Sequence, residues 1–291
     1  MSRLQQAEFL LAKQVSQPPV LTSPRPLDVQ RMSTEDLRAA MLIEKIFDGD
    51  KLSWTFTDLD RLAVGGVSPA APVKLENFKQ TGADFFLQRR EMGIINVGAA
   101  GVVTVDGKKY EMENLSCLYI SMGSKEVTFA SSSKKDRAKF YLMSCPAHRE
   151  YPTALVKKTE CNAVHLGSPA TANKRTIYQM IHINGIKSCQ LVMGFTELYE
   201  GSVWNTMPPH THLRRTEIYF YFDMGENVVS HFLGPPQNSR HLWVANEQVA
   251  LSPSWSIHCG CGTAAYKFIW AMGGENQTFD DMDKVGMLEL R

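Results

Sequence analysis

Short stretches that alternate apolar and polar residues fill most of the chain from about residue 43 onward. Side chains of a strand point to opposite faces in turn, so such alternation predicts strands with one face in a core. Turns that contain glycine separate these stretches at intervals of about 8–12 residues, and Asp106-Gly107 is a strong hairpin signal. Many short strands at this spacing predict an all-β fold, either a sandwich or a barrel of the jelly-roll type.

The first part of the chain does not follow this pattern. Prolines between residues 16 and 26 argue against a continuous helix, and residues 1–42 are therefore expected to form an N-terminal arm. A helix is expected to begin at Ser33, with Leu37, Met41 and Leu42 on one face. That apolar face predicts that the arm packs on the body of the protein or on a neighbour.

The alternation weakens once more in the middle of the chain. Residues 156–185 carry clusters of Pro, Lys and Asn and are expected to form a connection. This leaves residues 43–155 as a first barrel and residues 186–291 as a second barrel with a C-terminal tail. The tail is expected to be a loop with a short terminal helix.

The two expected barrels look like a degenerate repeat. The stretch LQRREMGIINVG around Glu91 resembles LRRTEIYFYF around Glu217, and NLSCLYISMGSKEV resembles EQVALSPSWSIH. In the second comparison Val127 stands where His258 stands. The first stretch also has no His-x-His before its Arg-Arg-Glu, so the first barrel is expected to keep the fold and to lack a metal.

Residues 207–222, MPPHTHLRRTEIYFYF, gather side chains that bind metals. His210 and His212 would share one face of a strand, whereas Glu217 has the wrong parity for the same strand, so the LRRT between them must bend or turn. A later strand would bring His258 to the same point. Three imidazoles and one carboxylate suit Zn(II), Fe(II), Mn(II) or Ni(II). We expect about one divalent metal per chain, in the second barrel only.

Composition and charge exclude several classes of function. The chain has 291 residues, 44% of them hydrophobic and 21% charged, and its formal net charge is +1. This balance is ordinary for a globular protein and gives no general attraction to nucleic acid or to a membrane surface. Apolar runs are too short to span a bilayer, and the first residues lack a signal-peptide pattern, so we expect a cytoplasmic protein.

Six cysteines form no compact disulfide framework. Cys259 and Cys261 lie close to His258, and their thiolates could in principle bind a metal there. Small, buried and reduced thiols of a cytoplasmic protein are the better interpretation.

Motifs spread over about residues 40–291 resemble one known family. His-x-His-x4-Glu followed by a distant His resembles the cupin superfamily, although Trp255 stands where the second cupin motif has glycine. The closer resemblance is to the 5-keto-4-deoxyuronate isomerases, also called 4-deoxy-L-threo-5-hexosulose-uronate ketol-isomerases. It is carried by DRLAVGGV, FFLQRREMGIINVGAAGVVTVDG, PAHREYPT, WNTMPPHTHLRRTEIYFYF and GENQTFDDMD. The arm before residue 30 departs from the family pattern.

The resemblance implies two tandem cupin barrels in one chain, a hexamer, and a zinc ion on His210, His212, Glu217 and His258. It also implies a place in the bacterial breakdown of pectin and related uronates. The substrate would be 5-dehydro-4-deoxy-D-glucuronate and the product 3-deoxy-D-glycero-2,5-hexodiulosonate. Two alternatives stay open. One is an Fe(II) cupin dioxygenase, because the same ligands serve that chemistry. The other is a non-catalytic, sugar-sensing bicupin.

An isomerase of this kind needs groups beside the metal. An enediol route requires a general base near the substrate, whereas a direct hydride shift requires none. The candidates for the base are Tyr219, His241 and Glu197, and Tyr219 shares its parity with Glu217 on the expected strand. Because titratable side chains are expected near the metal ligands, the sequence favours the enediol route, but only slightly.

The carboxylate of the implied substrate calls for a cation. An arginine that binds both carboxylate oxygens would suit it. The candidates are Arg214 and Arg215, beside the metal ligands, and Arg175 in the stretch NKRT.

Overall fold

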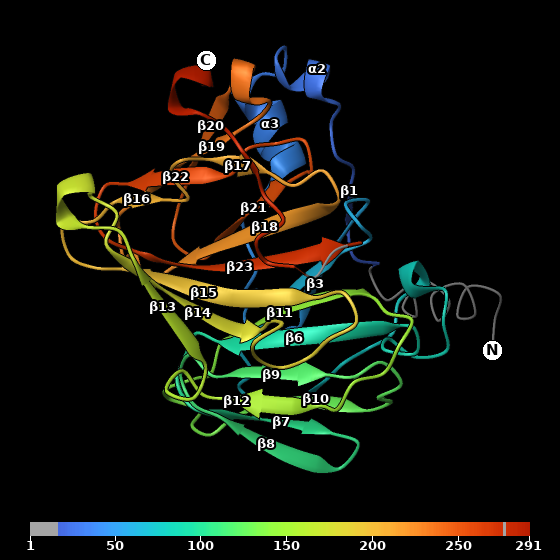
Figure 1. Ribbon diagram of the computed structural model, residues 1–291. Helices are drawn as coiled ribbons and strands as arrows, with labels where there is room; N and C mark the ends of the chain where they lie inside the picture. The colour runs from blue at the N-terminus through green and yellow to red at the C-terminus, as the bar shows by residue number, and fades with distance from the viewer. Residues whose placement is uncertain (1–16, 276–277) are drawn as a thin grey trace.

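The computed structural model describes residues 17–275 and 278–291, and within these ranges the regular secondary structure consists mainly of strands (Figure 1). Four large sheets form two pairs, and two further strands form a small ribbon. The all-β prediction is confirmed. The first 16 residues of the expected arm lie outside the described ranges. No helix within the described ranges is both long and apolar enough to cross a membrane.

The first pair of sheets occupies the first half of the chain. Its strands are β1 (Val20–Leu21), β3 (Ser53–Thr57), β4 (Ala63–Val67), β5 (Val73–Lys74), β6 (Arg90–Asn96), β7 (Gly101–Val105), β8 (Lys108–Met112), β9 (Cys117–Ile120), β10 (Val127–Ser131), β11 (Phe140–Pro146) and β12 (Ala154–Val156). One sheet has the order β1-β3-β4-β11-β6-β9-β12 and the other β5-β10-β7-β8. Buried apolar side chains of both sheets, such as Ile94 and Phe129, pack into one core between them. The hairpin predicted at Asp106-Gly107 joins β7 to β8 and is confirmed.

The second pair of sheets repeats this arrangement. Its strands are β2 (Leu42–Ile43), β13 (Asn162–Leu166), β14 (Arg175–Ile181), β15 (Val192–Leu198), β16 (Trp204–Asn205), β18 (Arg215–Phe222), β19 (Val229–Leu233), β20 (Arg240–Val244), β21 (Gln248–Ser252), β22 (Cys259–Gly262) and β23 (Lys267–Gly274). The orders are β13-β14-β15-β23-β18-β21-β2 and β16-β22-β19-β20. Because β4-β11-β6-β9 and β15-β23-β18-β21 are connected along the chain in the same way, the predicted repeat is confirmed.

The segment expected as a connection, residues 156–185, supplies strands to the second pair of sheets. β14 pairs with β15, and β13 pairs with β14 at the edge of the sheet. The expectation of a connection is therefore wrong for most of this segment. The alternation is hidden there because most side chains of the edge strand β13 are exposed and polar residues are tolerated. The expected limits of the two barrels, 43–155 and 186–291, stay predictions.

The described part of the arm packs on both pairs of sheets. Helices α2 (Pro26–Val29) and α3 (Thr34–Met41) lie on the second pair, and the Ser33 hydroxyl accepts the Asp36 amide as the predicted cap of α3. Strand β1 pairs with β3 of the first pair, whereas β2 pairs with β21 of the second. Of the two alternatives for the arm, packing on the body is the one observed.

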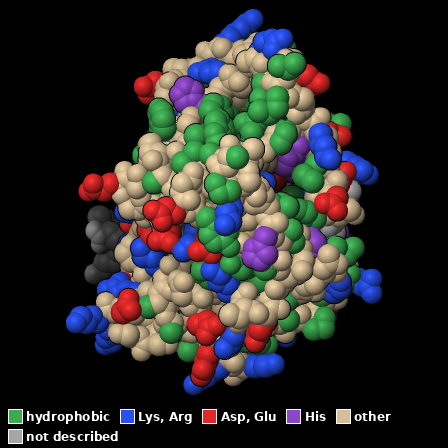
Figure 2. Space-filling model, turned by 60° about the vertical axis from the view of Figure 1, so that its left-hand side comes forward, with side chains coloured by type: hydrophobic (Ala, Val, Ile, Leu, Met, Phe, Trp, Pro, Cys, Tyr) green, Lys and Arg blue, Asp and Glu red, His purple; other side chains and the backbone are tan. Residues whose placement is uncertain are grey.

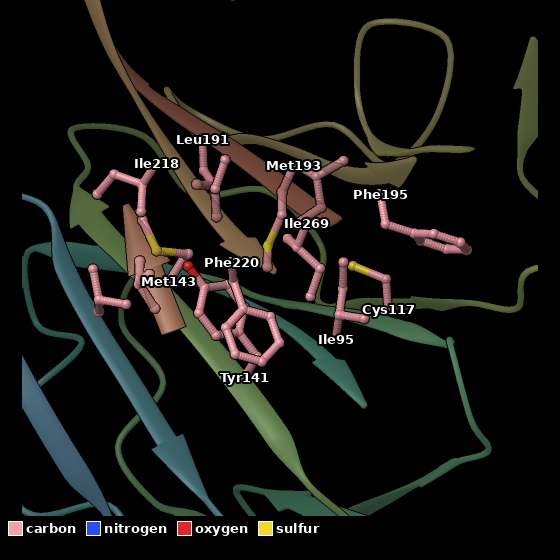
Figure 3. Packing of buried hydrophobic residues seen from close by; sticks show 14 of the residues in the cluster. Ile95, Cys117, Tyr141, Met143, Leu191, Met193, Phe195, Ile218, Phe220 and Ile269 are labelled. Atoms are coloured by element: carbon pink, nitrogen blue, oxygen red, sulfur yellow. The ribbon is translucent and has the colours of Figure 1, made fainter. Parts of the chain in front are cut away.

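The two seven-stranded sheets pack against each other, and their facing side chains form the core between the two pairs (Figure 3). Tyr141 of β11 stacks on Phe220 of β18 with ring centroids 4.5 Å apart, and Met143 and Met193 are fully buried nearby. Strand β18 is thus covered on one face by the first pair of sheets. Its other face is free to point into the interior of the second pair.

The chain ends in short elements that run past this interior. The ribbon pairs β17 (His210–Thr211) with β24 (Asp283–Lys284). Single 3-10 turns occupy Lys79–Thr81, Pro169–Thr171, Pro236–Asn238 and Met287–Glu289. The expected terminal helix is the last of these, one 3-10 turn.

Candidate metal centre and cavity

Four predicted ligands converge on one point in the second pair of sheets. Their ligand atoms all lie within 4.8 Å of one another. His210 Nε2 is 3.0 Å from His212 Nε2 and 3.1 Å from His258 Nε2. Glu217 Oε2 is 3.0 Å from His212 Nε2 and 2.8 Å from His258 Nε2. No other such cluster of three or more potential ligands occurs among the residues that the structure describes.

Three separate pieces of chain bring these side chains together. β17 carries His210, and after Leu213 and Arg214 the chain turns into β18, whose inner face carries Glu217. The predicted turn is confirmed, although β17 pairs with β24 rather than with β18. His258 lies one residue before β22, in the loop after β21, and not within a strand as expected.

The chemistry of the four side chains fits a divalent cation. His212 Nδ1 lies 2.6 Å from the carbonyl oxygen of Asp281 and 3.3 Å from Nε of Arg215. Because a carbonyl oxygen can only accept, the shorter contact requires a proton on Nδ1, and the longer one is then a packing contact and not a hydrogen bond. His212 Nε2 then carries a lone pair that faces the Glu217 carboxylate. Two acceptors at this distance repel each other unless a cation lies among them, and ligands of a tetrahedral zinc ion are separated by roughly 3.3 Å. A hydrogen bond that fixes the other ring nitrogen is usual for a metal-binding histidine.

The protonation states also suit cation binding. Burial, and next the neighbouring His258, lowers the pKa of His210 to about 2, so this imidazole is neutral. Burial alone would raise the pKa of Glu217, but the imidazoles of His258 and His212 outweigh it and hold this pKa well below its usual range. A neutral imidazole, as at His210, and an ionised carboxylate, as at Glu217, are the forms that bind a metal.

A cavity of about 510 Å³ opens over the cluster. His210, His212 and Glu217 contribute to its lining. Most of the wall is apolar, with Leu166, Ile177, Met207, Phe268, Trp270, Met272, Phe279, Met282 and Val285. Its other polar groups are Arg175, Thr196, Thr206, Tyr219 and Lys284. An apolar wall with a few convergent polar groups is typical of a small-molecule site.

Two of the six predicted substrate and base residues line this cavity. Tyr219 has the parity of Glu217 on β18, and its hydroxyl lies 2.9 Å from Thr206 Oγ1. Burial and the charge of Glu217 raise the pKa of Tyr219 well above its usual range, so the phenol keeps its proton. Arg175 starts β14 and bonds the Asn173 carbonyl oxygen at 2.9 Å, which leaves the rest of its guanidinium for the cavity.

The other two predicted bases lie elsewhere. Glu197 is on the opposite face of β15 from the cavity-lining Thr196, and it pairs with Lys158 at 2.6 Å and Lys267 at 3.3 Å. His241 is exposed on the outer face of β20, where its ring meets Trp243 edge to face. The structure therefore removes both as candidates for the base, because strand parity turns them away from the cavity.

The adjacent arginines also lie outside the cavity lining. Arg214 is mostly exposed and pairs with the Asp281 carboxylate at 3.2 Å. Arg215 is 1% exposed and donates to backbone carbonyl oxygens of Thr278 and Phe279 at 2.7 and 2.9 Å. Neither reaches the cavity as the predicted carboxylate ligand, since both are held by the chain segment after β23.

Residues 278–286, named the wall segment here, form a part of the site that no sequence pattern predicts. This segment contributes Phe279, Met282, Lys284 and Val285 to the cavity. The sequence around it, GENQTFDDMD, contributes to the family resemblance but shows neither strand nor helix periodicity. Periodicity therefore gives no sign that residues 278–286 fold over the cluster.

Comparison with known proteins matches the chain to one family. The model of the KduI/IolB family matches residues 43–286. A 4-deoxy-L-threo-5-hexosulose-uronate ketol-isomerase of Opitutus terrae is 54% identical over 271 residues, which cover 92% of this chain and 98% of the relative. The enzyme of the same name from Lachnoclostridium phytofermentans is 49% identical, over 93% of this chain and 99% of the relative.

Solved structures show the same fold at low identity. An IolB-like protein from Salmonella typhimurium superposes with a TM-score of 0.64 at 13% identity, over 77% of this chain and 86% of that one. Oxalate decarboxylase from Lactobacillus farciminis gives 0.54 at 9% identity, over 75% and 78%. These two support the fold alone. With the family model matching most of its length and relatives near 50% identity over nine-tenths of it, the chain belongs to the KduI/IolB family.

Proposed function

We propose that this chain is a metal-dependent ketol-isomerase that converts 5-dehydro-4-deoxy-D-glucuronate into 3-deoxy-D-glycero-2,5-hexodiulosonate in uronate breakdown. The observation that carries the proposal is the cluster of His210, His212, Glu217 and His258 beside a cavity of about 510 Å³, in a chain whose relatives bear the name of this activity. The reaction moves a carbonyl from the terminal carbon to its neighbour, so no atom is gained or lost.

A bound divalent metal would supply Lewis-acid polarisation of the substrate's carbonyl and hydroxyl oxygens. The side chains around it bind and orient the substrate. The apolar wall around Trp270 and Phe279 limits access of water to the reacting carbons. The Tyr219 hydroxyl, which keeps its proton, can donate a hydrogen bond to an oxygen that gains charge and can return a proton to it.

Arg175 is the proposed ligand of the substrate carboxylate. It is half-buried in the cavity wall, and Lys284 is a second cation on the same wall. A planar guanidinium can bind both carboxylate oxygens, which a lysine cannot do. Replacing Arg175 with Lys should therefore raise KM more than it lowers kcat, and an unchanged KM would exclude this role.

Zinc is the proposed metal, at one ion per chain, although the same ligands accept other divalent metals. The donor set of three imidazoles and one carboxylate supports zinc. The proposed location is the cytoplasm, where the six free cysteines would stay reduced. Elemental analysis of the purified protein measures the metal. Stripping and reloading with Zn²⁺, Mn²⁺, Fe²⁺ and Ni²⁺ then ranks the activities.

A homo-oligomer, with six chains as in the resemblance above, is proposed for the assembly. Aromatic rings on the outer face of the sheet β16-β22-β19-β20, half-buried at Trp204 and Phe232 and exposed at Trp243, support it. Trp204 stacks on Phe232, and Trp243, 53% exposed, meets His241. Figure 2 shows hydrophobic side chains gathering over the half of the molecule that holds the second pair of sheets. Light scattering of the purified chain measures the assembly.

The deciding experiment follows product formation by NMR in air and under argon. Equal rates and an isomeric product support the proposal. Oxygen consumption in step with turnover would favour the alternative Fe(II) dioxygenase, and tight binding without turnover would favour the sugar sensor. The same assay in heavy water tests the route, because an enediol allows solvent deuterium to enter the new CH₂OH group and a hydride shift does not.

A further inference from the structure

Arg215 begins β18 and is buried between the metal cluster and the wall segment (residues 278–286). Its guanidinium donates to three backbone carbonyl oxygens of that segment: Thr278 at 2.7 Å, Phe279 at 2.9 Å and Asp281 at 3.2 Å. A side chain that is 1% exposed and satisfied by three carbonyl groups fixes the path of the backbone that carries them.

One of those carbonyl groups also fixes a metal ligand. The Asp281 oxygen that accepts from Arg215 accepts the Nδ1 proton of His212 at 2.6 Å. This bond sets the tautomer and the ring plane of His212, so that Nε2 faces Glu217 and His210. Arg215 thus holds the atom that orients the ligand.

The wall segment is tied to the cluster at a second place. β24 pairs with β17, which places Lys284 opposite His210, and the Val285 amide donates to the Pro209 carbonyl at 3.0 Å. Between the two ties, Phe279 and Met282 line the cavity. The same stretch of backbone therefore forms a wall of the cavity and supports two of the four ligands.

We propose that Arg215 is a positioning residue that couples metal binding to the order of the wall segment. Its three hydrogen bonds to carbonyl groups hold the segment against the cluster. A change that lowers the affinity for the metal therefore also loosens the segment that closes the cavity, and the reverse holds as well. The inference rests on the metal site of the proposed function. Arg215 Nε also lies 3.3 Å from His212 Nδ1, so its role is exerted on His212 and on the segment, without contact with the substrate.

The chain provides a matched control in the first pair of sheets. Arg90 begins β6, the strand equivalent to β18, and it is 7% exposed. It also donates to backbone carbonyl oxygens, those of Arg61 and Ser144, both at 2.8 Å. No cluster of potential metal ligands lies in the first pair of sheets, within the described part of the chain. Arg90→Lys therefore reports the cost of losing a buried guanidinium without any metal ligand nearby.

The test measures the affinity for Zn²⁺ by competition with a chromophoric chelator, and the hydrogen exchange of peptides that cover residues 278–286. Arg215→Lys keeps the positive charge but loses the planar guanidinium, whose N–H groups donate to several carbonyl oxygens at once. It should weaken Zn²⁺ binding by about 10–100-fold, as is common when the partner of a ligand is disturbed. Arg90→Lys should bind Zn²⁺ like the wild type. Zn²⁺ should slow exchange of the wall segment in the wild type, and less so in Arg215→Lys.

Unchanged Zn²⁺ affinity in Arg215→Lys, or an equal loss in Arg90→Lys, overturns the coupling. The coupling is also overturned if Zn²⁺ does not change the hydrogen exchange of the wall segment in the wild type. This measurement needs no variant, so it decides the matter even if Arg215→Lys does not fold. A wild-type protein that binds no Zn²⁺, Mn²⁺, Fe²⁺ or Ni²⁺ overturns the metal-dependent function itself. That result is distinct from one in which the metal binds and only the coupling fails.

Discussion

Strands β6 and β18 occupy the same place in the two seven-stranded sheets, and each begins with a buried arginine followed by a buried glutamate. The glutamates have opposite environments. Glu91 follows Arg90 directly and points between the sheets, where the amides of Cys189, Gln190 and Leu191 each donate to it at 2.7 Å.

Glu217 comes two residues after Arg215 and points into the second pair of sheets, toward His212 and His258. In the first pair Met92 holds the corresponding position and packs in the core. A single additional residue, Thr216, therefore separates a carboxylate that joins the two halves from one that belongs to the candidate metal cluster. Strand parity decides the function of the side chain.

The largest expected effect is on Glu217. Replacing it with Ala removes the only carboxylate of the cluster, so the metal content should fall and turnover should drop by roughly 10³-fold or more, since a bound metal contributes several kcal/mol. Elemental analysis and the isomerase assay measure both. Full metal content in Glu217→Ala would show that the three histidines suffice.

Next comes Tyr219. Tyr219→Phe should lower kcat by about 10²-fold while the metal content stays intact, because it removes a proton donor and no ligand. Tyr221→Phe is the matched control: it lies on the same face of β18 but deeper, bonded to His231 Nδ1 at 2.8 Å and outside the cavity lining. Equal kcat values for the two variants would remove Tyr219 from the reaction.

Glu91→Gln tests the other side of the comparison. It turns an oxygen that accepts backbone amides into a donor facing them, and it should lower the free energy of unfolding by about 1–3 kcal/mol. Urea denaturation measures this loss. Zn²⁺ affinity should not change, and a loss of Zn²⁺ binding as large as that of Glu217→Ala would contradict the separation of roles.

The last prediction concerns acid and needs no substitution; near neutral pH its effect is the smallest. Burial, then the neighbouring His258, lowers the pKa of His231 to about 3 in the folded protein, whereas an unfolded histidine titrates near 6.5. The unfolded state therefore takes up a proton first as the pH falls below 6.5. Stability is lost between the two pKa values, at up to about 1.4 kcal/mol per pH unit for this one group.

Buried histidines belong to the second half of the described chain, whereas the buried polar residues of the first pair of sheets include none. In metal-free protein, hydrogen exchange at pH 5 should therefore rise in β18–β22 before it rises in β6–β10. His231→Gln should reduce the dependence of stability on pH. Simultaneous exchange of both halves would mean that they unfold as one unit.

Much of the fold and of the candidate site can be predicted from the sequence. The period of two predicted the strands, the turn chemistry predicted the β7–β8 hairpin, and Ser33 predicted the start of α3. The ligand types and their parity predicted the cluster, together with the turn between His212 and Glu217. These features depend on residues that are close in sequence, so the spacing of residue types along the chain is enough to predict them.

Only the tertiary structure determines which residues that are distant in sequence contact each other. Glu91 looked equivalent to Glu217, yet its three amide donors lie about a hundred residues away. Arg215 looked like a substrate ligand, but the wall segment, more than sixty residues later, takes up its guanidinium. Local sequence determines which face a side chain is on, because the pleat alternates. What that face meets depends on which other segment folds against it, and only the packed chain determines that.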